Sequence, residues 1–97
     1  MQGTPGSIAY LVTYRGSVQG VGFRFTVVRM ANEYDGVAGW VRNNSDGSVS
    51  MHVQGPANEV EMLLEDIANG PHRSYIRDVT TQACPPDAAL SRFGVKY

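Results

Sequence analysis

Apolar residues recur at every second position in a strand and about every 3.6 positions in a helix. The order of these two patterns along the chain restricts the fold more than any other sequence feature. Residues 8–14 are apolar on both sides and predict a buried, central strand. Glycines at 16, 20 and 22 end that strand. The apolar spacing from Phe23 to Tyr34 is then that of one helix face, and the helix is expected to end at Asp35-Gly36.

The middle of the chain predicts a hairpin. Residues 37–42 indicate a second strand, and residues 43–47 read Asn-Asn-Ser-Asp-Gly, the composition of a tight turn. Residues 48–54 alternate between apolar and polar side chains, which predicts a third strand. Its inward side chains would be Val49, Met51 and Val53, and its outward ones Ser50 and His52.

The remainder adds a second helix and two more strands. Asn58 and Glu61 resemble a capping box, and Asn69-Gly70-Pro71 is typical of a helix end. Strands are predicted over 74–83 and 90–97. The complete order predicts an α+β, ferredoxin-like βαββαβ sandwich with an added C-terminal strand. Both helices would lie on one face of a mostly antiparallel sheet.

Length and charge narrow the class of protein. A chain of 97 residues allows one domain, which we place at 8–97, after a flexible N-terminal tail at 1–7. The net charge is -1, which argues against an extended nucleic-acid surface. The sequence has no apolar run of about 20 residues and no signal peptide, so we expect neither a membrane span nor secretion.

The single cysteine, Cys84, cannot form an internal disulfide, which favours a cytoplasmic, reducing compartment. We interpret Cys84 as a small, partly buried hydrophobe rather than a nucleophile. Neither His52 nor His72 has the spacing to a second ligand that a metal site needs, so we expect both to be solvated. No metal and no cofactor are predicted.

A candidate anion site follows from the topology. A helical crossover makes the first two strands parallel, so the loop at 16–22 and Asn43 should lie side by side. Glycine conformations free backbone N–H groups at the start of a helix, and these suit an oxyanion. Arg24 could reach back over the same concavity. On spacing alone, a plain turn with a surface arginine is an equal alternative, and the loop matches neither a Walker nor a dinucleotide motif.

The motifs around this loop resemble a known family. Residues 18–24, Val-Gln-Gly-Val-Gly-Phe-Arg, and residues 39–43, Gly-Trp-Val-Arg-Asn, are similar to the two signature segments of acylphosphatases. The resemblance includes Asp46-Gly47-Ser48-Val49 and extends to the closing Phe-Gly-Val-Lys-Tyr at 93–97. It covers nearly the whole chain after residue 7, although Ser17 stands where a basic residue is common.

The resemblance implies a metal-independent hydrolase that converts a carboxyl-phosphate anhydride to a carboxylate and inorganic phosphate. Phosphate would be both product and inhibitor, and the enzyme would be a monomer. Asn43 would orient the attacking water. The phosphate would be held by Arg24 and the backbone amides of Gln19, Gly20, Val21, Gly22 and Phe23.

Other functions remain open at this point. A non-catalytic anion-binding or regulatory ferredoxin-like module would keep the loop and Arg24 but would not need Asn43. An RNA-binding domain would need aromatic residues on the third strand, which has none. The domain could also come from, or have evolved beside, a larger carbamoyl-transferring protein.

Overall fold

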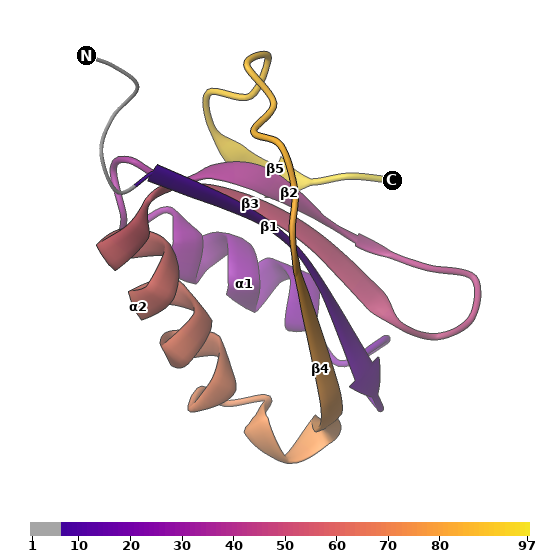
Figure 1. The fold of residues 1–97 in the computed structure, drawn as a ribbon. Helices are drawn as coiled ribbons and strands as arrows, with labels where there is room; N and C mark the ends of the chain where they lie inside the picture. Colours follow the sequence, from indigo (N-terminus) through magenta and orange to yellow (C-terminus); the bar gives the residue numbers. More distant parts are fainter. Residues whose placement is uncertain (1–6) are drawn as a thin grey trace.

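Five strands form one sheet, and both helices pack on the same face of it (Figure 1). The computed structural model describes residues 7–97. Most of the predicted tail, residues 1–6, lies outside the described residues, and Ser7 already belongs to the first strand. The elements are β1 (Ser7–Gly16), α1 (Phe23–Ala31), β2 (Ala38–Asn43), β3 (Val49–Pro56), α2 (Ala57–Ala68), the 3-10 turn η1 (Arg73–Tyr75), β4 (Ile76–Ala83) and β5 (Phe93–Val95).

The strand order places the ends of β1 and β2 together. The order in the sheet is β4-β1-β3-β2-β5. Both β1 and β2 pair antiparallel with β3, so they run parallel to each other on its two sides. Val49 of β3 lies opposite Tyr14 of β1 and also opposite Asn43 of β2. With β5 parallel to β2, the sheet is mixed, and the predicted α+β ferredoxin-like fold is confirmed.

The core lies between the sheet and the helices, where apolar side chains from both layers meet. The predicted inward residues Val49, Met51 and Val53 are all fully buried. Val27 of α1 and Leu63 of α2 cover them from the helical layer. Burying each such side chain contributes about 1.5–3 kcal/mol. Tyr14 joins this core, and burial raises the pKa of its hydroxyl above the ordinary value.

Several predicted element boundaries were wrong. The helix α2 begins at Ala57, directly after Pro56, and no side chain caps it, so the proposed capping box does not form. The strand predicted from residue 74 begins at Ile76, because η1 occupies the residues before it. The last strand is limited to Phe93–Val95, the residues that pair with β2.

The first helix also stops earlier than the apolar spacing predicts. It ends at Ala31, and Tyr34 lies in the turn that follows, where its N–H donates to the Ala31 carbonyl. The Tyr34 hydroxyl donates to the Asp66 carboxylate of α2, and this bond raises the pKa of Tyr34 to about 12. Tyr34 therefore connects the turn to α2 through its polar end. Within residues 7–97 no helix is long and apolar enough to cross a membrane.

Residues 84–92, the crossing segment, must traverse the sheet because β4 and β5 lie at opposite edges. The segment contacts the intervening strands in turn. Its Cys84 N–H donates to the Ala9 carbonyl of β1, and its Asp87 N–H donates to the Gln54 side chain of β3. The crossing segment thus covers part of the face that carries no helix. For this reason the prediction that His52 is solvated was wrong: its residue is only 9% exposed.

Candidate active site

A small hollow lies between the loop after β1 and the end of β2. Its volume is about 150 Å³, well below the roughly 300–1,000 Å³ of pockets that hold drug-sized ligands. It brings together most of the residues predicted to act there, whereas Gln19 and Val21 are not part of its wall. The hollow is lined by Val18, Gly20, Gly22, Phe23, Arg24, Phe25 and Asn43.

The loop presents backbone donors that the protein itself leaves unused. Gly20 and Gly22 adopt left-handed conformations, with φ of 77° and 79°, which side-chain-bearing residues rarely adopt. Gly22 is the N-cap of α1, and no side chain caps that helix end. The N–H groups of residues 19–23 find no backbone acceptor within the described part of the chain. These donors, at the positive end of a helix, are available to an anion.

Arg24 brings positive charge to the hollow from the first turn of α1. Its guanidinium carbon lies 5.8 Å from the ring centroid of Phe25 and 5.5 Å from that of Tyr97. Aromatic rings at this distance attract a cation and restrict its positions. No carboxylate among residues 7–97 forms an ion pair with Arg24. Its charge is therefore not neutralised by a described acidic residue.

Asn43 is free to face the hollow because its neighbour makes the polar contacts of the turn. The Asn44 amide donates to the hydroxyls of Ser48 and Ser50, at 2.9 and 2.7 Å. The Asn44 N–H donates to the Ser48 carbonyl at 2.8 Å. The side chain of Asn43 is exposed at the end of β2 and lines the hollow.

Gln19 has a structural contact that the sequence did not indicate. Its side-chain Nε2 donates to the carbonyl oxygens of Asn44 and Ser48, at 2.7 and 2.9 Å. One side chain thus ties the loop to the hairpin that carries Asn43.

His72 holds the loop from the other side, and the prediction that it is solvated was also wrong. Its residue is 9% exposed, with its ring packed edge-on against Phe23 at a centroid distance of 5.5 Å. Its Nε2 donates to the Val21 carbonyl at 2.7 Å. The C=O and N–H of a trans peptide point in opposite directions. The Gly22 N–H therefore points away from His72.

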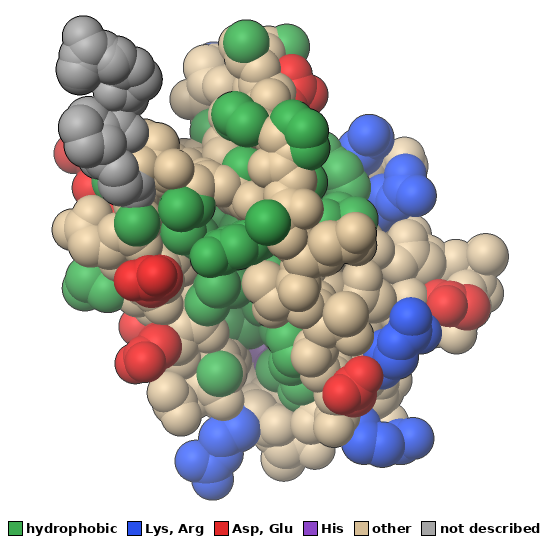
Figure 2. Space-filling view, in the orientation of Figure 1, with side chains coloured by type: hydrophobic (Ala, Val, Ile, Leu, Met, Phe, Trp, Pro, Cys, Tyr) green, Lys and Arg blue, Asp and Glu red, His purple; other side chains and the backbone are tan. Residues whose placement is uncertain are grey.

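The charges around this end of the molecule are mostly basic. Figure 2 shows Lys and Arg side chains gathered on the side where β1 and the β2–β3 hairpin end. Arg15 forms an exposed ion pair with Asp46 at 3.5 Å. Hydrogen bonds from Ser48, more than the charge of Arg15, lower the pKa of Asp46. Within residues 7–97 no group of three or more His, Cys, Asp or Glu side chains is arranged to hold a metal ion.

The fold and the hollow define a class of protein: a ferredoxin-like domain whose glycine-rich loop precedes a helix without a side-chain cap. Comparison with known proteins narrows this class. The acylphosphatase family model matches residues 10–95. An acylphosphatase from Burkholderia thailandensis is 42% identical over 84 residues, which are 87% of this chain and 85% of the relative.

Solved structures agree with the sequence comparison. The crystal structure of acylphosphatase from Bacillus subtilis superposes with a TM-score of 0.83 at 33% identity, covering 93% of this chain and 99% of the other. Full-length HypF, solved in a phosphate- and nucleotide-bound form, gives a TM-score of 0.86 at 26% identity. That match covers 100% of this chain but 13% of HypF, so the same fold also occurs within a much larger protein.

The chain therefore belongs to the acylphosphatase family, and by homology it is an enzyme that hydrolyses acyl phosphates. The sequence-based resemblance to this family is confirmed.

The Gln19 contacts give a prediction about the loop. In Gln19→Glu, a carboxylate would face two carbonyl oxygens and lose both bonds, so the free energy of unfolding should fall by about 1–3 kcal/mol. Urea denaturation measures this change. The control is Gln82→Glu on the exposed surface of β4, which should change stability by less than about 0.5 kcal/mol. Equal effects of the two substitutions would show that Gln19 does not hold the loop.

Proposed function

We propose that acyl phosphates are hydrolysed in the hollow between the β1–α1 loop and Asn43, without a metal ion. The backbone amides of residues 19–23 and the guanidinium of Arg24 hold the phosphoryl group, and the Asn43 side chain orients the attacking water. One observation carries this proposal. A helix N-terminus and an arginine that have no side-chain cap and no acidic partner within residues 7–97 line one small hollow together with Asn43.

The reaction requires the protein mainly to position the water and the phosphoryl group and to stabilise negative charge. The water oxygen bonds to phosphorus while the bond between phosphorus and the acyl oxygen breaks. The acyl oxygen leaves with the electron pair as a carboxylate, and a water proton passes to the product phosphate. The conjugate acid of this leaving group has a pKa of about 4, so it departs without a general acid.

The proposed residues match the distribution of charge in such a reaction. Phosphoryl transfer has a loose transition state with negative charge on the equatorial oxygens. Fixed N–H donors and a guanidinium stabilise that charge without reorganising during the reaction. The Asn43 amide can accept a hydrogen bond from water and hold its oxygen in line with the scissile bond.

Removing the guanidinium tests the phosphate-holding role. Arg24→Ala should lower turnover of benzoyl phosphate by about a thousandfold and abolish inhibition by inorganic phosphate. Steady-state kinetics with phosphate as inhibitor measures both. Arg29→Ala, in the exposed last turn of the same helix, is the control and should keep wild-type rates. A fully active Arg24→Ala variant would discard the proposed site.

A substitution at Asn43 distinguishes phosphate binding from catalysis of hydrolysis. Asn43→Ala should reduce kcat by about a hundredfold or more, because the water loses its alignment, while the inhibition constant of phosphate stays nearly unchanged. Ser45→Ala, exposed in the same turn, is the control. Wild-type kcat in Asn43→Ala would contradict the role given to Asn43. Phosphate binding by the wild-type protein with no hydrolysis would instead favour the non-catalytic anion-binding module.

Metal independence can be tested directly. Treatment of the wild-type protein with EDTA should leave the rate of acyl phosphate hydrolysis unchanged, because Arg24 and the amides supply the positive charge. Disappearance of the acyl phosphate is followed with hydroxylamine. A loss of activity that added Mg²⁺ restores would overturn the proposed metal-free mechanism.

A further inference from the structure

A second polar cluster lies at the other end of the sheet, where the crossing segment meets β3. The Cys84 Sγ is 3.7 Å from Nδ1 of His52. On the other side of the ring, His52 Nε2 is 2.7 Å from Oε1 of Gln54. A thiol, an imidazole and an amide thus follow one another in a line, and none of them lines the hollow described above.

The backbone of Asp87 determines which ring nitrogen of His52 carries the proton. The Asp87 N–H donates to Oε1 of Gln54 at 2.8 Å, and the Asp87 carbonyl accepts from Nε2 of Gln54 at 3.0 Å. Since a backbone N–H can only donate and a carbonyl can only accept, the Gln54 amide has one possible orientation. Its Oε1 must then accept from His52. In the neutral ring the proton is on Nε2, and the lone pair of Nδ1 faces the thiol.

His52 is also shielded and fixed in place. Its residue is 9% exposed, and its ring stacks on Trp40 at a centroid distance of 6.0 Å and an interplanar angle of 26°. Nδ1 has no hydrogen-bond partner among residues 7–97 apart from the Cys84 sulfur. A nucleophile, a base within reach of its proton and a third group that orients the base form the arrangement found in activated cysteine sites.

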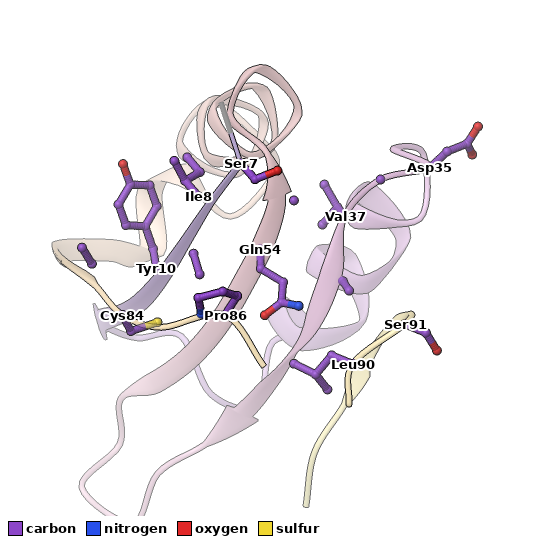
Figure 3. Close-up of a pocket in the computed structure, with 15 residues that line it drawn as sticks. Ser7, Ile8, Tyr10, Asp35, Val37, Gln54, Cys84, Pro86, Leu90 and Ser91 are labelled. Carbon is purple, nitrogen blue, oxygen red and sulfur yellow. The ribbon is translucent and has the colours of Figure 1, made fainter. Parts of the chain in front are cut away.

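The thiol has access to a cavity. Cys84 is half-buried and lines a space of about 590 Å³, within the range of pockets that hold small organic molecules. Figure 3 shows Cys84 and Gln54 on its wall, together with the apolar side chains of Tyr10, Val37, Pro86 and Leu90. His52 is not part of the wall, and it contacts two residues that are, Cys84 and Gln54.

We propose that Cys84 is a reactive thiol that exchanges with low-molecular-weight disulfides entering this cavity, with His52 as the base. The Cys84 proton passes to Nδ1 of His52, and the thiolate attacks one sulfur of the disulfide. The disulfide bond breaks, a mixed disulfide forms on Cys84, and the departing thiolate takes the proton back from His52. This reaction is separate from acyl phosphate hydrolysis. Cys84 is partly buried, as the sequence-based interpretation expects, and the proposal adds a chemical role for its thiol.

Ellman's reagent, an aromatic disulfide, tests the proposal on the intact protein. Cys84 is the single cysteine, so the thiol that the reagent reports is Cys84. We expect the folded protein to react about tenfold faster than the same chain unfolded in urea, because only the folded chain has the base. This comparison needs no variant. A folded thiol that reacts more slowly than the unfolded one would overturn the proposal.

Substitutions then identify the base. His52→Gln should slow the reaction of the folded protein by about tenfold or more. The matched control is His72→Gln. The chain contains two histidines, both 9% exposed, and His72 packs against Phe23 of α1, away from Cys84. Oxidised glutathione should add one glutathionyl group to the wild type and none to Cys84→Ala, measured by mass spectrometry. Equal rates in His52→Gln and His72→Gln would rule out His52 as the base.

Discussion

The candidate active site depends on backbone N–H groups that remain unpaired while everything around them is held in place. An unpaired backbone N–H raises the free energy of the folded state unless water or a ligand accepts its hydrogen bond. A loop with several such groups therefore needs stabilising contacts from the rest of the protein. Gln19 provides that support on the hairpin side by binding the carbonyls of Asn44 and Ser48. His72 provides it on the helical side through the Val21 carbonyl. Both contacts use carbonyl oxygens, so the N–H groups of the loop stay unpaired.

The broad layout of the site follows from topology, and the sequence could therefore predict it. A crossover through α1 makes β1 and β2 parallel, which brings the glycine loop and Asn43 to one edge. The family motifs indicated the same residues. Gly20, Gly22, Phe23, Arg24 and Asn43 do line one hollow, as expected. The catalytic roles assigned to them stay predictions.

The supporting contacts could not be predicted because hydrogen bonds to main-chain carbonyls leave no periodic pattern in the sequence. The sequence placed Gln19 and His72 in loops but gave no indication of the carbonyl groups that their side chains bind. His52 was misjudged for a different reason. Alternation correctly placed it on the face opposite the helices, but only the strand order, with β4 and β5 at opposite edges, reveals that the crossing segment covers that face. The bond from the Tyr34 hydroxyl, in the turn after α1, to Asp66 of α2 was likewise not indicated by the sequence.

The position of β1 between β4 and β3 has a consequence for how the enzyme acquires its activity. This strand comes first in the chain, yet it pairs with β3 and with β4, which are made much later. Pairing between segments distant in sequence carries the entropy of closing long loops and slows folding. The glycine loop is attached directly to β1, and Ser17 at its start donates to the carbonyl of Tyr75, just before β4. On a ribosome, the glycine loop would acquire its final shape only after the segment that contains His72 and β4 had emerged.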